Sequence, residues 1–199
     1  MKGFFSKYSY SVVKMLINQF AIGIFGAVLS MATTTAGSDP LTIVVSIFAI
    51  LFYLFLIYNM MWEIGAKDRL AVDYKKQPYR PHTGLIIALI ANIPNFLIAI
   101  SQTVTAPFMG MKWANALRSG TLVVYLVLEG MYLGLCGTWT ISVGGVATSL
   151  QSFWWMYYII IVPALVTSWL AYYIGHKNFR ILSLFGVVPK NPDQGKKKS

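Results

Sequence analysis

Two long stretches of this chain, residues 15–66 and 119–176, contain no lysine or arginine, although the 199-residue sequence has 16 of these residues. A helix needs about 20 apolar residues to cross the hydrocarbon core of a bilayer, and each stretch is longer than that. Charged residues amount to 11% of the chain and hydrophobic residues to 57%, which leaves too little polar surface to cover the core of a soluble protein. The sequence therefore predicts an integral membrane protein.

Cysteine and histidine are also scarce, with only Cys136, His82 and His176 in the chain. A single cysteine cannot form an intramolecular disulfide or a cysteine metal cluster. The sequence has no zinc-hydrolase, serine-hydrolase or nucleotide-binding motif, and its acidic residues match no ligand spacing of a metal site. We expect neither a metal nor another cofactor, and we favour a nonenzymatic protein.

The formal net charge of +10 would suggest nucleic-acid binding in a soluble protein. Here the basic residues lie between apolar runs and at both ends of the chain, as juxtamembrane charges do. They indicate contact with anionic lipids at the membrane surface, and we expect no nucleic-acid partner.

The apolar runs predict an all-α bundle of about six helical segments, which form one transmembrane domain over residues 1–199. The expected segments are residues 12–32, 41–62, 85–101, 103–118, 120–138 and 152–174. Proline and glycine interrupt residues 103–118, so this segment is expected to be short or re-entrant. A cytoplasmic loop over residues 63–84 and a basic tail over residues 175–199 complete the chain.

The distribution of basic residues predicts the orientation of the bundle, because lysine and arginine are enriched in cytoplasmic loops. Five spans would place the lysine-rich tail outside. If residues 103–118 return to the cytoplasmic side, every lysine and arginine is cytoplasmic, and residues 33–40 and 140–150 lie outside. We therefore expect both termini in the cytoplasm and the protein in a bacterial plasma membrane.

Glu129 is the only acidic residue inside an apolar run. A charge at that depth costs several kcal/mol, so such a group faces a polar cavity, forms a pair or stays protonated. Asn92, Pro94 and Asn95 interrupt another run, and broken helices with polar side chains recur at solute sites. Glu129, Asn92, Pro94, Asn95 and Asn18 are thus candidates for a solute or proton site. The alternative is a structural hydrogen bond between Glu129 and one of Asn92, Asn95, Asn18 and Gln19.

Small residues four apart predict close packing of two helices. Gly23 with Ala27 forms one such pair, and Gly130 with Gly134 forms another.

Four basic residues in the main cytoplasmic loop predict a docking or lipid-contacting surface, since no nucleophile or general base accompanies them. They are Lys67, Arg69, Lys75 and Lys76.

Six helices in about 200 residues, with both termini inside, resemble in size and layout the substrate-binding membrane subunits of energy-coupling-factor vitamin importers. The resemblance implies that Gly23 and Ala27 belong to a small-residue contact face. The chain departs from this family at residues 33–40, which are too short for a long extracellular lid. We expect a small-solute-binding or transport-associated membrane subunit. The alternatives are an accessory subunit that docks a larger membrane complex through its basic loop, and a membrane enzyme without a recognisable motif.

Overall fold

The computed structural model describes residues 2–76, 78, 80–177 and 179, so the predicted basic tail beyond residue 179 lies outside the described residues. The described chain is mostly helical, which confirms the all-α prediction. Its helices are α1 (Lys2–Thr35), α2 (Asp39–Asp73), α3 (Thr83–Ala91), α4 (Ile93–Thr105), α5 (Lys112–Leu128), α6 (Leu133–Thr138), α7 (Met156–Ile159) and α8 (Val162–His176). Short 3-10 turns lie at Ala106–Phe108, Gly130–Tyr132 and Leu150–Ser152, and the strands β1 (Thr140–Val143) and β2 (Val146–Ser149) form an antiparallel hairpin.

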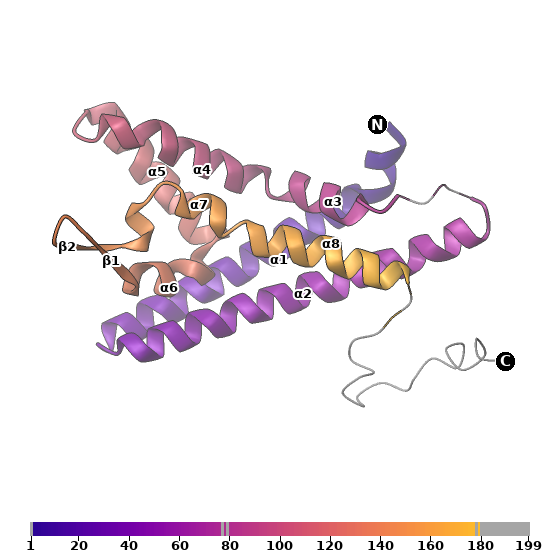
Figure 1. The fold of residues 1–199 in the computed structure, drawn as a ribbon, viewed down its shortest axis with the longest axis horizontal. Helices are drawn as coiled ribbons and strands as arrows, with labels where there is room; N and C mark the ends of the chain where they lie inside the picture. The colour runs from indigo at the N-terminus through magenta and orange to yellow at the C-terminus, as the bar shows by residue number, and fades with distance from the viewer. Residues whose placement is uncertain (1, 77, 79, 178, 180–199) are drawn as a thin grey trace.

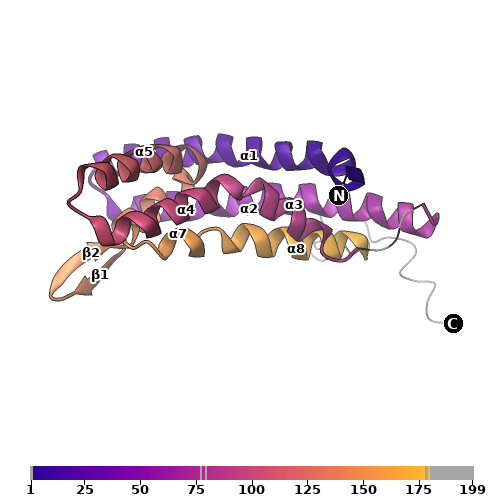
Figure 2. The same ribbon diagram turned by 90° about the horizontal axis from the view of Figure 1, so that it is seen from above.

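Three helices among the described residues are long and apolar enough to cross a membrane, namely Phe4–Thr35, Asp39–Asp73 and Met156–His176. Helices α1 and α2 lie side by side along the molecule and are joined by a tight turn (Figures 1 and 2). Each is about 50 Å long at 1.5 Å per residue, so each extends beyond the roughly 30 Å hydrocarbon core. The helical lengths and composition support an integral membrane protein.

Helix α8 packs closely on α2 because glycines remove side chains from the contact. A Cβ atom at Gly65 would overlap the carbonyl oxygen of Tyr172, and one at Gly175 would overlap the carbonyl oxygen of Trp62. Gly84 brings α3 against the same helix, since a Cβ atom there would lie 2.5 Å from Cβ of Tyr172. Large side chains then fill the space inside the bundle, among them Met15, Ile57, Met61, Ile87 and Met131, which have no solvent exposure.

Two further apolar stretches are bent pairs of helices. The α3–α4 pair bends by 56° next to Asn92, where Pro94 follows in the first turn of α4 and lacks a backbone N–H. The α5–α6 pair bends by 91° at residues 129–132. The described residues therefore contain three candidate spans, or up to five if each bent pair counts as one, and the predicted count of about six helical segments is not confirmed.

The structure divides residues 103–138 differently from the sequence prediction. Residues 106–111 form the turn between α4 and α5, so the expected segment 103–118 is split between two helices. The expected straight span 120–138 is interrupted in its middle. Hydropathy predicted both segments from the apolar runs, and it carries no information about a bend inside a run.

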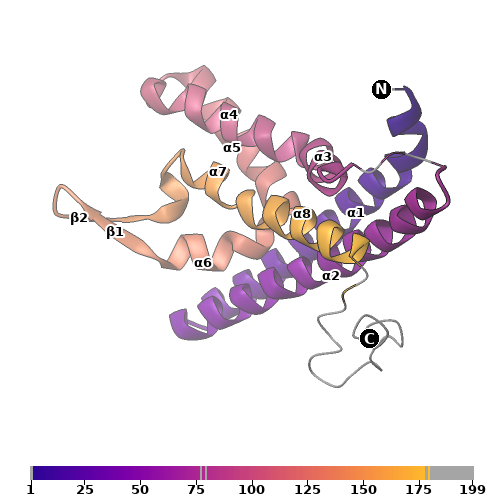
Figure 3. The ribbon, with the colours of Figure 1, turned by 45° about the vertical axis from the view of Figure 1, so that its right-hand side comes forward.

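The α5–α6 pair enters and leaves the bundle at the same end. In Figures 1 and 3, α5 starts at the end of the molecule that also carries the β-hairpin and the α1–α2 turn, runs into the bundle, and α6 returns toward the hairpin. Nη2 of Arg118 donates a hydrogen bond of 3.3 Å to the carbonyl oxygen of Ser152, close to that hairpin. The start of α1, the α2–α3 loop and the end of α8 lie at the opposite end, which we call the terminal end. Lys112, at the start of α5, and Arg118 thus lie away from the terminal end, and the predicted cytoplasmic position of all basic residues stays a prediction.

The exposed β-hairpin was not predicted. Gly144 and Gly145 form its two-residue turn with φ of 60° and 83°, a conformation that glycine adopts readily. It follows α6 directly and lies within the expected outer loop, residues 140–150.

Candidate functional site

Glu129 lies where α5 ends, at the 91° bend. Only 3% of this residue is exposed, and its Oε1 accepts a hydrogen bond of 2.8 Å from Nε2 of Gln19 in α1, a residue with no solvent exposure. The two residues are 110 positions apart in the chain. The bend therefore presents a carboxyl group to α1 inside the bundle.

Four buried oxygen atoms around this bend have no hydrogen-bond partner among the described residues: Oε2 of Glu129, Oε1 of Gln19, and the hydroxyl oxygens of Tyr53 and Tyr132. Tyr53 belongs to α2, and Tyr132 to the 3-10 turn that follows the bend. Both tyrosines lie near enough to Glu129 to interact electrostatically with its carboxyl group. Glu129, Gln19, Tyr53 and Tyr132 are called the Glu129 cluster below.

An unpaired carboxylate is strongly unfavourable in such a buried site. No ion pair of Glu129 is found among the residues that the structure describes, and no group of three metal-ligating side chains occurs there either. Gln19 supplies one hydrogen bond, which does not neutralise a charge. The carboxyl group therefore needs a proton or another small cation.

Small residues hold the bend against α1. A Cβ atom at Gly130 would lie 2.5 Å from the carbonyl oxygen of Gly23 and 2.7 Å from Cβ of Ala27. One at Gly134 would overlap Oγ of Ser46 in α2 and would lie 2.9 Å from Oγ of Ser30 in α1. The four residues singled out by small-residue spacing thus lie at contacts of the α5–α6 bend with its neighbours, and Gly130 meets both Gly23 and Ala27.

The asparagines of the predicted site, Asn92 and Asn95, form hydrogen bonds with each other and with the backbone, and not with Glu129. Nδ2 of Asn92 donates to the carbonyl oxygen of Ala88 at 2.8 Å, and Nδ2 of Asn95 donates to Oδ1 of Asn92 at 2.7 Å. Both bonds lie within the α3–α4 bend, where the carbonyl oxygen of Ala88 also accepts the backbone N–H of Asn92 at 2.9 Å. Asn18 is half-buried in α1. None of the hydrogen bonds found among the described residues joins these asparagines to Glu129.

Sequence reasoning missed Tyr53 and Tyr132 as members of the site. A phenol within an apolar run is itself a sign of a polar neighbourhood, because its hydroxyl group seeks a partner when it is buried. The chain has 12 tyrosines, however, and several flank membrane interfaces. Only the fold shows which of them lie beside the carboxyl group, where the buried Tyr125 also interacts electrostatically with Glu129.

A cavity of about 470 Å³ opens near the α1–α2 turn, away from the terminal end. Thr34 and Asp39 line it on one side, and Leu133, Gly134 and Thr138 of α6 line it on the other. Gly134 lies about one helical turn beyond Gly130. No residue of the Glu129 cluster lines the cavity, and Leu133, which does, directly follows Tyr132 of the cluster.

A second buried carboxyl group, that of Asp68 in α2, lies at the terminal end and is 3% exposed. It accepts hydrogen bonds from Nζ of Lys7 at 2.6 Å, from the hydroxyl of Tyr8 at 2.6 Å and from the hydroxyl of Tyr172 at 2.9 Å. These donors come from α1 and α8, so Asp68 ties three helices together.

The four basic residues predicted to form a docking surface lie at the end of α2. Lys67 forms an ion pair of 2.7 Å with Glu63, and Arg69 one of 3.5 Å with Asp73. Lys75 and Lys76 are exposed just beyond the helix. Their role in docking remains a prediction.

No protein family, curated protein or solved structure matches this chain. The resemblance in layout to energy-coupling-factor subunits stays a prediction, and the α5–α6 bend interrupts the expected span 120–138. The function is argued from the site itself.

Proposed function

We propose that this chain is a transport-associated membrane subunit that binds and releases a monovalent cation, H⁺ or Na⁺, at the Glu129 cluster. The observation that carries this proposal is the set of four unpartnered buried oxygen atoms around one carboxyl group at a broken helix. Broken membrane helices with exposed polar groups recur at ion and solute sites of transporters.

The charge and chemistry of the cluster favour a small monovalent cation. One carboxylate supplies a single negative charge, which balances one positive charge and leaves a divalent ion half-neutralised. The remaining atoms are amide and phenol oxygens, which suit hard cations and hydrogen bonding to a protonated carboxyl group. Neutralisation also removes the penalty for burying the carboxylate.

We further propose that α1, α2, α3–α4 and α7–α8 cross the membrane and that α5–α6 is a re-entrant hairpin. The terminal end would then be cytoplasmic, because it carries most of the described basic residues whereas the other end carries Lys112 and Arg118. The cavity beside Asp39 and Gly134 would open outward and give the cation its entry. A bacterial plasma membrane fits this charge distribution.

The test is infrared difference spectroscopy on the protein in lipid nanodiscs, recorded once for Na⁺ exchanged against K⁺ at fixed pH and once for a pH change without Na⁺. We expect a carboxyl band that responds to one of these exchanges and that disappears in Glu129→Gln. Glu63→Gln, which removes an exposed carboxylate, is the matched control and should retain the band.

The two exchanges separate Na⁺ from H⁺ as the bound cation. If Glu129→Gln is folded and its spectra equal those of the wild type in both exchanges, the proposal is wrong. Glu129 would then be a structural acid, and the accessory-subunit alternative would gain weight.

A further inference from the structure

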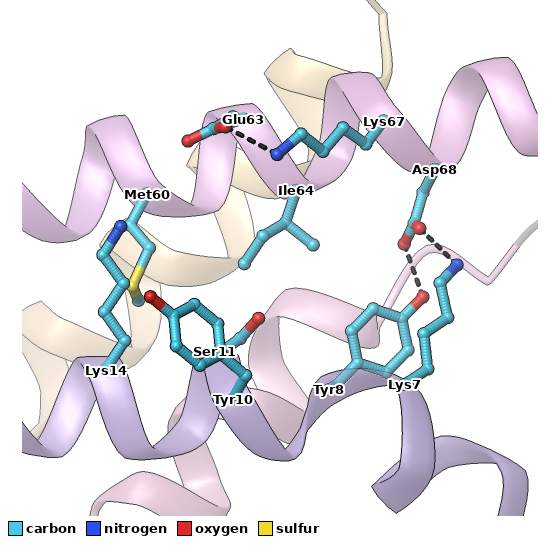
Figure 4. A pocket seen from close by; sticks show the side chains of 10 residues that line it. All are labelled: Lys7, Tyr8, Tyr10, Ser11, Lys14, Met60, Glu63, Ile64, Lys67 and Asp68. Carbon is cyan, nitrogen blue, oxygen red and sulfur yellow. Dashed lines mark hydrogen bonds and ion pairs between the residues drawn. The ribbon is translucent and has the colours of Figure 1, made fainter.

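A groove of about 390 Å³ lies between α1 and α2 at the terminal end. Figure 4 shows its two walls: Tyr10, Ser11 and Lys14 come from α1, whereas Ile64 and Lys67 come from α2. In this view, Lys14 extends from α1 toward α2 across the groove. Polar and apolar side chains thus share one site that is open on one side.

The groove lies at the level along α1 and α2 where the apolar part of both helices begins. Lys14 is the last basic residue before the stretch 15–66, which lacks lysine and arginine, and Lys67 is the first one after it. Because α1 and α2 are antiparallel neighbours, these two lysines mark the same level on both helices. Lysines at this level reach the headgroup region of the bilayer.

Two of the three lysines that line the groove form ion pairs with its two carboxylates. Asp68 accepts hydrogen bonds from Lys7 and two tyrosines, and Glu63 pairs with Lys67. Lys14 forms no ion pair within the described part of the chain, and it acts on the carboxylate of Glu63 only through a longer-range electrostatic attraction. Three lysines against two carboxylates leave a net charge of +1, which matches the single negative charge of a phosphodiester.

An exposed apolar strip continues from the groove into the membrane region. Tyr10, Lys14, Ile17 and Ala21 follow one another at helical spacing on one face of α1, where Tyr10 is 75% and Ile17 is 58% exposed. A phosphate held at Lys14 would place attached acyl chains along Ile17 and the residues beyond it. Free phosphate has no apolar part that could contact this strip, so the strip favours a lipid over inorganic phosphate.

We propose that this groove is a binding site for an anionic phospholipid, with Lys14 and the hydroxyl groups of Tyr10 and Ser11 holding the phosphate and the α1 strip holding the acyl chains. An anionic headgroup near one membrane-surface lysine gains about 1 kcal/mol, which corresponds to about a fivefold change in affinity. The hydroxyl donors add geometric selectivity to this charge term.

The experiment is native mass spectrometry of the detergent-solubilised full chain, titrated with phosphatidylglycerol or with phosphatidylcholine of the same acyl chains. We expect preferential binding of phosphatidylglycerol, weakened about fivefold in Lys14→Gln and restored in Lys14→Arg. Lys112→Gln is the matched control, since it removes one lysine at the other end of the molecule, and it should bind like the wild type.

Three outcomes would overturn this assignment. Equal binding of the two lipids, or equal weakening by Lys112→Gln, would leave only non-specific charge attraction. Inorganic phosphate that competes with the lipid at equal concentration would show a free-anion site instead. Glu129→Gln should retain lipid binding, so the test of this lipid site is independent of the test of the proposed cation site.

Discussion

Two carboxyl groups of this chain are equally buried and differ in their partners. Asp68 accepts hydrogen bonds from one ammonium group and two hydroxyl groups, whereas Glu129 accepts one from an amide and leaves an oxygen without a partner among the described residues. Buried polar groups in proteins are usually satisfied, so an unsatisfied one calls for an explanation. This contrast assigns a structural role to Asp68 and supports a binding role for Glu129.

At Asp68, replacement by alanine should lower the free energy of unfolding by about 3 kcal/mol, because bonds to a charged acceptor are lost and the hydroxyls of Tyr8 and Tyr172 lose a partner. Asp73→Ala, which removes an exposed ion pair, should cost roughly 0.5 kcal/mol. Unfolding in mixed micelles of mild detergent and dodecyl sulfate measures both. Equal effects of the two substitutions would contradict the structural role of Asp68.

At the scale of elements, the α5–α6 bend depends on its contact with α1. A Cβ atom at Gly23 would overlap the carbonyl oxygen of Val127, which is backbone and cannot move aside as a flexible side chain does. The same substitution at Gly120, in the middle of α5, meets nothing within 4 Å. Alanine raises helix propensity at both positions, whereas it disturbs packing only at Gly23. Comparing the two substitutions therefore isolates the effect of packing.

We therefore expect Gly23→Ala to lower the free energy of unfolding by about 1–3 kcal/mol. Gly120→Ala should leave stability unchanged or raise it by up to about 1 kcal/mol, because alanine favours a helix more than glycine does. The same mixed-micelle unfolding measures both variants. A harmless Gly23→Ala would mean that α5–α6 does not pack against α1 as described.

At the scale of the whole molecule, the position of Lys112 distinguishes the re-entrant hairpin from the six-segment prediction. The re-entrant arrangement places residue 112 outside the cell, with Ser38 and Ser142, whereas six segments place it in the cytoplasm with Lys75. Single cysteines at these positions, in a Cys136→Ala background, report the side through an impermeant thiol reagent.

We expect labelling in intact cells at positions 112, 38 and 142, and protection at position 75 until the cells are permeabilised. The physical reason is that most of the described basic residues lie at the terminal end. Protection at position 112 together with labelling at position 38 would restore the six-segment topology. Labelling at position 75 would reverse the orientation.

The sequence by itself determined that the chain belongs in a membrane and that it is helical. Lipid offers no hydrogen bonds to the backbone, so long apolar runs form helices whatever their neighbours are. The runs over residues 15–66 were sufficient to predict α1 and α2, and a lone acidic residue in an apolar run was sufficient to single out Glu129. These are local properties, which is why they can be read along the chain.

The tertiary structure decided where the helices formed by the apolar runs bend and which side chains they bring together. Whether residues 120–138 cross the membrane or turn back depends on the contact of Gly130 with Gly23 and Ala27, more than 100 positions away. The pairing of Glu129 with Gln19 and the burial of Asp68 among α1, α2 and α8 depend on the same packing. Hydropathy sums over neighbours in sequence, whereas bends and side-chain partners are fixed by neighbours in space.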